Sequence, residues 1–400
     1  MRVAVLCTDL GIRIPGSKGA SLHLQSIVCA LARAGHSILL IAVSGSARGA
    51  AAQPDVDAGW PDNVVLRLYP HPGRAEGAER ERRKLAYTEH VARDAEQSLR
   101  EFQPDVIYER LSLFGDAGTR LARVCKARHV VEVNALLAEE ETTWRGLHHS
   151  ELAVARERLV LASADLRVAV SEPTAAAVRR IAPDGPTEVL PNGFEAALFT
   201  SLPEQQVARR DLGLPPGPLL GFAGSLRPWH GLDVAVAALA DLPALALAVA
   251  GDGPVRAELT AQAAALGVHD RLLWLGQLPH RDMSRFLAAL DVAVLPYPNL
   301  PDLGFSPLKL YEYAAAALPV VASDIGPGAD VIGALDMGVL VTPGSASSLA
   351  AGVRSILDDR SVWRVKAQAA RARALTEHTW DDRATRLAGW LAPTPVRTSR

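Results

Sequence analysis

Hydrophobic residues in this chain gather in short runs, and longer stretches with apolar residues at helical spacing lie between them. Residues 64–69 form one such run, whereas the segment 79–102 repeats apolar side chains at Leu85, Val91 and Leu99. The two patterns alternate along nearly the whole chain. Such alternation predicts parallel sheets whose strands are connected by helices, an α/β fold.

The pattern predicts two successive series of strands. The first comprises 3–6, 37–43, 64–69, 104–108, 129–133, 166–170 and a strand at 189; the second comprises 219–223, 246–250, 272–275, 292–295, 320–322 and 338–341. The main predicted helices are 22–34, 79–102, 139–162, 172–181, one starting at 232, one ending at 266, 283–290 and 380–390.

A length of 400 residues exceeds one typical core and, with two strand series, predicts two doubly wound, Rossmann-like domains facing each other across a cleft. We expect them at 1–200 and 201–377. Residues 200–217, rich in Gln, Arg and Pro, are interpreted as the passage between them. Residues 378–392 are expected to form a helix that returns to the first domain, and 393–400 a flexible tail.

Charge and composition exclude several classes of protein. The net charge of −2 provides no basic surplus for nucleic acid, and no apolar run is long enough to span a membrane. Residues 74–100 allow at most weak peripheral membrane contact, because their charges nearly balance. Cys7, Cys29 and Cys125 suit buried thiols in a reducing compartment. With no apolar leader segment, we expect a cytoplasmic protein.

Candidate ligand-binding groups in the first half lie after the predicted strands. Gly16, Ser17 and Gly19 form a glycine loop at the entrance of a helix, where backbone N–H groups can approach an anion. A plain turn explains this loop about as well. Glu132 and Asn134 end the strand 129–133, at the sheet edge where ligands of α/β proteins bind.

The stretch 302–326 reads as a turn, a short helix and an apolar strand. Ser306 and Pro307 suit an N-cap and the first helical position, so the following N–H groups would face an incoming anion. Lys309 near this helix start is unfavourable unless it meets an anion, and Glu312 lies one turn further on. The alternative is an ordinary capped helix.

Five segments of the second half resemble, in order and spacing, family-4 retaining glycosyltransferases of the GT-B fold. They are Gly-Ser-Leu-Arg-Pro-Trp-His-Gly from 224, Val-Ala-Gly-Asp-Gly-Pro from 249, Leu-Gly-Gln-Leu-Pro from 275, Asp-Val-Ala-Val-Leu-Pro-Tyr from 291 and Ser-Pro-Leu-Lys-Leu-Tyr-Glu from 306. The loop at 15–20 and Leu-Pro-Asn-Gly ending at 193 agree as well.

This resemblance implies that the C-terminal domain binds a nucleotide diphosphate sugar, UDP- rather than GDP-linked, and the N-terminal domain an acceptor. The acceptor would be a small molecule, a glycolipid or a saccharide with a hydroxyl or amine. No cofactor or metal is implied. The implied donor-binding residues are Gly16, Ser17, Gly19, Gly224, Arg227, His230, Gly251, Gly276, Ser306, Pro307, Leu308, Lys309 and Glu312, the last gripping the ribose.

Four positions differ from the family pattern. Gly304 occupies the place of the first Glu of the family's Glu-x7-Glu pattern, and Ser225 and His230 stand where a basic pair is usual. Asn134 stands where many members carry a His that contacts the donor sugar. We therefore expect Asn134, Glu132, Arg227 and Lys309 to carry catalysis. The alternatives are a catalytically silent nucleotide-sugar-binding protein, and a pseudoglycosyltransferase or epimerase of the same fold.

Acceptor and base contacts are expected in loops. Residues 45–62 and 71–84, with Trp144 and Arg145, are predicted to shape the acceptor site, and the base is expected near 275–277.

Overall fold

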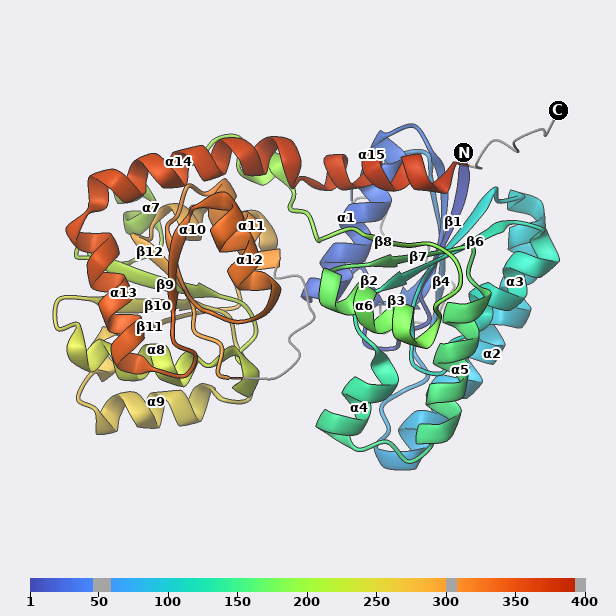
Figure 1. Cartoon of the computed structure of the whole chain (residues 1–400), viewed down its shortest axis with the longest axis horizontal. Helices are drawn as coiled ribbons and strands as arrows, with labels where there is room; N and C mark the ends of the chain where they lie inside the picture. The colour runs from blue at the N-terminus through green and yellow to red at the C-terminus, as the bar shows by residue number, and fades with distance from the viewer. Residues whose placement is uncertain (46–58, 300–307, 393–400) are drawn as a thin grey trace. The chain divides into compact units, whose positions relative to one another are not determined.

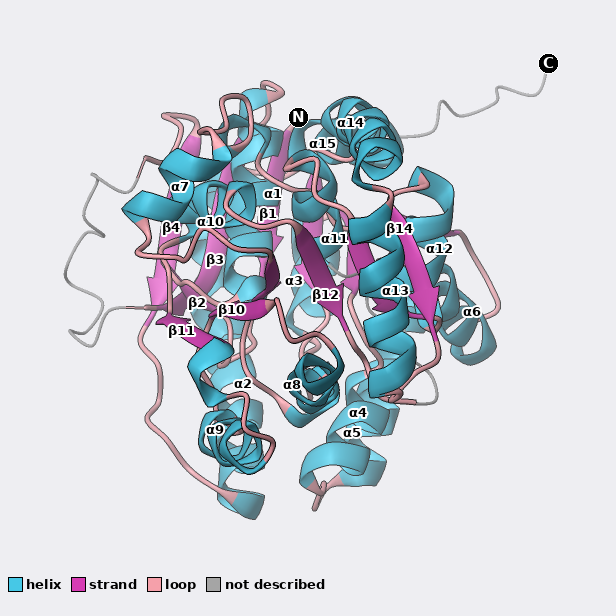
Figure 2. Ribbon diagram, turned by 90° about the vertical axis from the view of Figure 1, so that its left-hand side faces the viewer, coloured by secondary structure: helices cyan, strands magenta, loops and turns pink. Residues whose placement is uncertain are grey.

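The computed structural model describes residues 1–45, 59–299 and 308–392 (Figure 1). The chain divides into two compact units, one made of residues 1–192 with the C-terminal helix from Trp380, the other of the described parts of 193–379. Each unit contains one parallel sheet with its own helices, as the alternating pattern predicts. Figure 2 shows this alternation of strands and helices.

The N-terminal unit is built on a sheet in the order β2-β3-β1-β5-β6-β7-β8, with β4 also paired to β3. Every pairing in it is parallel. Its strands are β1 (Arg2–Leu6), β2 (Arg13–Ile14), β3 (Ser37–Ser44), β4 (Val64–Tyr69), β5 (Val106–Arg110), β6 (Arg128–Val133), β7 (Leu166–Ala169) and β8 (Thr187–Val189).

Helices connect these strands and bury their apolar faces on the sheet. They are α1 (Gly19–Arg33), α2 (Gly77–Phe102), α3 (Ala117–Cys125), α4 (Leu137–Arg145), α5 (Ser150–Ser163) and α6 (Glu172–Ile181). Tyr87, Val91 and Leu99 of α2 pack with Leu39 and Ile41 of β3 in one buried cluster. The 26-residue α2 is thus anchored by the apolar face that its periodicity predicts.

The single helix predicted for 139–162 is wrong. The chain forms α4 and α5, separated at Gly146, whose φ of +68° is a conformation that glycine adopts without strain. Buried Glu81 of α2 accepts hydrogen bonds from the backbone N–H groups of His148 and His149, at 2.8 Å each. A carboxylate from a distant helix therefore accepts the backbone hydrogen bonds of the segment between α4 and α5. Local periodicity does not reveal this contact.

The C-terminal unit is built on a parallel sheet in the order β11-β10-β9-β12-β13-β14. Its strands are β9 (Leu219–Ala223), β10 (Ala246–Ala250), β11 (Leu272–Gly276), β12 (Val292–Leu295), β13 (Val320–Ser323) and β14 (Gly338–Val341). Its α-helices are α7 (Gln205–Asp211), α8 (Leu232–Ala238), α9 (Arg256–Ala265), α10 (Met283–Ala288), α11 (Leu308–Ala315), α12 (Gly326–Leu335), α13 (Ala346–Asp358) and α14 (Arg360–Glu377).

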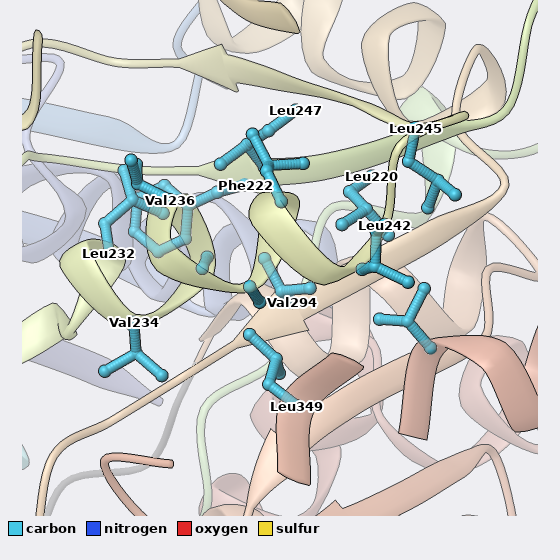
Figure 3. Close-up of a cluster of buried hydrophobic side chains, with 14 of the residues drawn as sticks. Leu220, Phe222, Leu232, Val234, Val236, Leu242, Leu245, Leu247, Val294 and Leu349 are labelled. Atoms are coloured by element: carbon cyan, nitrogen blue, oxygen red, sulfur yellow. The ribbon is translucent and has the colours of Figure 1, made fainter. Parts of the chain in front are cut away.

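The core of this unit fills the space between the sheet and one helical layer. Leu220 and Phe222 of β9 and Val294 of β12 meet side chains of α8 and α13, including Val236 and Leu349 (Figure 3). Alternate residues of the same strands are buried on the other face as well. Strands covered on both faces read as continuous apolar runs, which is why their limits were predictable.

The chain passes between the units at 192/193 and 379/380. The predicted boundary at residue 200 is therefore too late, and 200–217 is no linker, because Gln205–Asp211 forms α7 inside the C-terminal unit. The buried Arg209 of α7 donates to Asp291 Oδ2 at 2.8 Å and to the carbonyl of Ala289. These long-range contacts outweigh the polar composition of the segment.

The last helix, α15 (Trp380–Leu391), packs against α1 in the N-terminal unit. Trp380, Leu387 and Leu391 are buried on its inner face. In the described part of the chain, no helix is both long and apolar enough to cross a bilayer.

We predict that Leu387→Ala lowers the free energy of unfolding of the N-terminal unit by about 2–5 kcal/mol, because it opens a cavity beneath α15. Thr385→Ala, on the exposed face of the same helix, is the matched control and should change it by less than about 1 kcal/mol. Urea unfolding followed by circular dichroism measures both. Equal effects of the two substitutions would show that α15 is not held by its apolar face.

Candidate active site

A buried lysine without a partner lies in the C-terminal unit. The Lys309 ammonium on α11 is shielded from solvent and has no hydrogen-bond partner among the described residues. It lies 4.4 Å from the centre of the Phe222 ring, a cation–π contact. Burial lowers the pKa of Lys309 to about 7, and the nearby charge of Glu312 offsets only part of this shift. Such an arrangement favours an incoming anion.

Two glycines make room for this lysine. A Cβ on Gly224, whose φ is +138°, would lie 2.8 Å from Lys309 Cε. A Cβ on Gly251, with φ +157°, would lie 1.8 Å from the carbonyl oxygen of Gly224. The ends of β9 and β10 therefore approach each other as bare backbone, joined by the Gly224 N–H donating to Ala250 at 2.9 Å. A side chain at Gly251 would separate the two strand ends, and one at Gly224 would displace Lys309.

The loop after β9 holds two more of the expected donor-binding residues, Arg227 and His230. Arg227 is exposed, with its guanidinium 5.7 Å from the Trp229 ring centre. His230 Nδ1 donates to the Ser225 carbonyl at 2.5 Å. Burial, then the charges of Lys309 and Arg227, lower the pKa of His230 to about 3. His230, which stands where the family usually has a basic residue, is therefore neutral at physiological pH, and its Nε2 is a hydrogen-bond acceptor.

Glu312 lies one turn along α11 from Lys309. Its Oε1 accepts a hydrogen bond from His280 Nε2 at 3.0 Å. His280 follows β11, just beyond Gly276, which has φ +70° and no heavy atom near the position of a Cβ. The carboxyl ends of β9, β10 and β11 and the start of α11 thus contribute the candidate groups of this unit.

The glycine loop of the N-terminal unit leads into α1. Gly16 is tightly packed, since a Cβ there would lie 2.3 Å from the Arg13 carbonyl oxygen, and Gln25 Nε2 donates to the Gly16 carbonyl at 2.8 Å. Ser17 and Gly19 are exposed, and no side chain caps the first N–H groups of α1. The helix start therefore presents open backbone donors.

A second polar cluster surrounds Glu132 at the end of β6. Its Oε1 accepts from Arg110 Nη1 at 2.7 Å and from Asn134 Nδ2 at 2.5 Å. Its Oε2 accepts from the Tyr108 hydroxyl at 2.5 Å and from His23 Nε2 at 3.0 Å. Burial alone would raise the pKa of Glu132, but the charges of His23 and Arg110 and these hydrogen bonds hold it well below its usual range.

Two family models match this chain, one in each half. The model of glycosyl transferases group 1 matches residues 204–374, and that of the glycosyl transferase 4-like domain matches residues 18–193. Glycogen synthase of Mycobacterium tuberculosis is 30% identical over 298 residues, which are 72% of this chain and 68% of that protein. The chain belongs to the group 1 glycosyltransferases.

A 2-deoxystreptamine glucosyltransferase of Streptomyces kanamyceticus is 34% identical to this glycosyltransferase over 46% of the chain, and the chain spans about half the length (47%) of that relative. Among solved structures, sucrose-phosphate synthase from Thermosynechococcus elongatus superposes with a TM-score of 0.79 at 21% identity, covering 98% of both chains. The predicted GT-B fold, with two Rossmann-like domains, is confirmed.

The structure of this glycosyltransferase changes the role expected of Glu132. With four donors around it, the carboxylate has little capacity to take a proton, so it is not the catalytic group expected from sequence. It holds Arg110 and the Asn134 amide instead. Because Asn134 Nδ2 is engaged, its Oδ1 is the atom that remains to accept a hydrogen bond from a ligand.

Sequence reasoning missed His23 and His280. Buried His23 connects Glu132 to Asn192 Oδ1 (2.7 Å from His23 Nδ1) and meets the Trp380 ring edge-on at 4.8 Å. A histidine on the apolar face of the helix predicted for 22–34 is the signal that could have revealed it. His280 follows a predicted strand end, but its partner lies 32 positions away along the chain.

Some expected site residues lie outside the described residues. They are Gly304, Ser306, Pro307 and most of the loop 45–62; the side chains of Trp144 and Arg145 are likewise not described. Leu308 is the first residue of α11 and is partly buried. No group of three or more His, Cys, Asp or Glu side chains suited to a metal occurs among the residues that are described.

We predict that Lys309→Met changes how stability depends on pH. In the unfolded chain Lys309 titrates at its ordinary 10.5, against about 7 when folded, so the unfolded state binds the additional proton between these values and wild-type stability rises with pH. Met removes this contribution. The variant should be more stable than wild type by a few kcal/mol below pH 7, and the difference should vanish toward pH 10.5.

Urea unfolding at pH 6.5, 8 and 9.5 measures this difference. Other titrating groups cancel, because only the difference between the two proteins is compared. A difference that does not change with pH would contradict a buried, unpartnered ammonium.

We predict that Glu132→Gln destabilises the N-terminal unit by about 3–5 kcal/mol, because Arg110 loses its buried counter-charge and the new amide N–H₂ faces other donors. Glu151→Gln on the exposed surface of α5 is the matched control, with an expected change below about 1 kcal/mol. Thermal unfolding of both variants tests this. If Glu132→Gln were as stable as the wild type, the structural role would be contradicted and Glu132 would remain available as a base.

Proposed function

We propose that this glycosyltransferase is a retaining, metal-independent enzyme that moves a sugar from a nucleotide diphosphate sugar, UDP-linked rather than GDP-linked, to a hydroxyl or amine of an acceptor. The observation that carries the proposal is the Lys309 ammonium, which is buried beside the bare backbone of Gly224 and has no hydrogen-bond partner among the described residues. A buried cation of this kind is costly unless an anion completes it, and a diphosphate is such an anion.

Lys309 would bind the diphosphate and neutralise charge that develops as the glycosidic bond breaks. The ring of Phe222 and the backbone of Gly224 pack against its side chain. The exposed Arg227 is free to add a second cation. The backbone N–H groups at the start of α11 lie at the positive end of the dipole of that helix, which favours negative charge.

The acceptor hydroxyl would attack the anomeric carbon from the face that the diphosphate leaves, and the leaving phosphate would take the hydroxyl proton. No enzymatic nucleophile or base is needed, which agrees with a Glu132 saturated by hydrogen-bond donors. Asn134 Oδ1 and the neutral His230 Nε2 are acceptors suited to sugar hydroxyls.

For the acceptor we propose a small polyhydroxylated or amino-substituted ring, with glycolipids and saccharides as the other classes. The relative named 2-deoxystreptamine glucosyltransferase supports a small ring, although the match covers about half of each chain. The relative named glycogen synthase supports a saccharide. The cytoplasm is the proposed location.

A second candidate is a nucleotide-sugar-binding protein without turnover. It is favoured by Gly304 and Asn134, which stand where the family usually has a Glu and a His. It predicts donor binding in calorimetry with no release of nucleotide.

We predict nucleotide release when the purified protein meets its donor and acceptor. UDP-glucose, UDP-N-acetylglucosamine, UDP-galactose and GDP-mannose should be combined with 2-deoxystreptamine, inositol and short glucans, with UDP and GDP measured. Lys309→Met should lower kcat/KM by about 10²–10³-fold, the effect of losing one group that stabilises developing charge. Lys366→Met, which removes a surface lysine paired with Asp336, is the matched control.

EDTA should leave the rate unchanged, and the anomeric coupling constant of the product should match that of the donor. Turnover that needs a divalent metal, or an inverted product, would contradict the mechanism. Binding without turnover for every acceptor would favour the silent binder.

A further inference from the structure

His280 has no role so far, although its partner Glu312 is one of the expected donor-binding residues. His280 belongs to the short 3-10 turn His280–Asp282 that follows β11, and Glu312 lies on α11. The Nε2–H of His280 donates to Oε1 of Glu312 at 3.0 Å. Both side chains are largely covered, with 29% and 14% of their surfaces exposed.

We propose that His280 is a positioning residue for the ribose of the donor: it holds the Glu312 carboxylate by Oε1 and leaves Oε2 for the ribose hydroxyls. This inference rests on the proposed function and on the ribose-binding role that the family resemblance implies for Glu312. His280 itself need not touch the donor.

The hydrogen bonding of Glu312 supports this assignment. A carboxylate has two oxygens and about four lone pairs, and the described residues contribute a single hydrogen bond to Glu312, the one from His280. A vicinal diol donates two hydrogen bonds, which the remaining lone pairs can accept. Without His280, the Glu312 carboxylate would lose the hydrogen bond that orients it, and fixing it on binding would cost free energy.

The charges around the pair strengthen it. Burial lowers the pKa of His280, but the hydrogen bond and charge of Glu312, with a smaller effect of Glu195, outweigh this and raise it above 6.5. On its own turn, Asp282 is within 3.9 Å of Arg281 and 3.8 Å of Arg285 of α10. Glu312 therefore favours the protonated form of His280, in which the 3.0 Å hydrogen bond between them is charge-assisted.

The pair must weaken as pH rises. His280 has a folded pKa above its ordinary value, so its stabilising charge is complete at low pH and is lost as pH rises through the folded pKa. The preference for ribose hydroxyls, which depends on an oriented Glu312 carboxylate, should therefore weaken as pH rises. Lys309 also titrates, but it acts on the diphosphate and cancels when two ligands with the same diphosphate are compared.

The test uses the full chain and calorimetric affinities for UDP and 2′,3′-dideoxy-UDP, or the GDP pair if GDP binds more tightly. Wild type at pH 6 should prefer the ribonucleotide by about tenfold or more. His280→Leu should reduce this ratio to below threefold, while its affinity for inorganic pyrophosphate stays within twofold of wild type. His269→Leu, an exposed histidine of the same unit, is the control and should keep the wild-type ratio.

His280→Gln keeps a neutral N–H donor at similar reach. Its ratio should equal that of wild type within about threefold at pH 6 and stay flat to pH 9, whereas the wild-type ratio falls. This variant decides the question if His280→Leu does not fold.

Several results would overturn the inference. They are a full ribose preference in His280→Leu, an equal loss of pyrophosphate affinity, or a pH dependence in His280→Gln identical to wild type. Wild type that binds UDP or GDP with no ribose preference would reject the ribose role alone. Wild type that binds neither nucleotide would reject the proposed function.

Discussion

The buried ammonium of Lys309 is the constraint around which the candidate site of the C-terminal unit is arranged. Desolvation of a cation is unfavourable unless something offsets it, and here the Phe222 ring and Glu312 offset it only in part. Gly224 and Gly251 are required at the adjoining strand ends because a side chain at either would collide with the lysine or the neighbouring backbone. The described residues of the unit thus leave this charge incompletely stabilised.

The buried carboxylate of Glu132 in the N-terminal unit is, in contrast to Lys309, fully hydrogen-bonded. Glu132 receives four hydrogen bonds, two of them from groups that carry or can carry positive charge, and is satisfied without a ligand. A satisfied network holds its members in one arrangement, whereas an unsatisfied charge attracts a partner. This contrast separates a structural role for Glu132 from a ligand-binding role for Lys309, although both are buried, charged and near strand ends.

Much of the fold was predictable from the chain because buried parallel strands carry their own signal. The strands at 64–69, 219–223, 246–250, 292–295 and 338–341 have the predicted limits. The runs 219–223, 246–250 and 292–295 are buried almost throughout, as expected for strands covered on both faces, whereas 64–69 and 338–341 are partly exposed. The break at Gly146 and the placement of 200–217 were not predictable. Each depends on a distant partner, the Glu81 carboxylate in one case and Asp291 in the other.

By itself, the sequence determined the family, the two-domain α/β architecture and the position of Lys309 beside a helix start, because these follow from local periodicity and from residues close together in the chain. Only the tertiary structure decided which groups are charged. His230 is neutral and Glu132 is held ionised because burial and neighbours from other elements set their pKa values. The pairing of His280 with Glu312 was decided there as well, since hydrogen bonds form between groups that folding brings together.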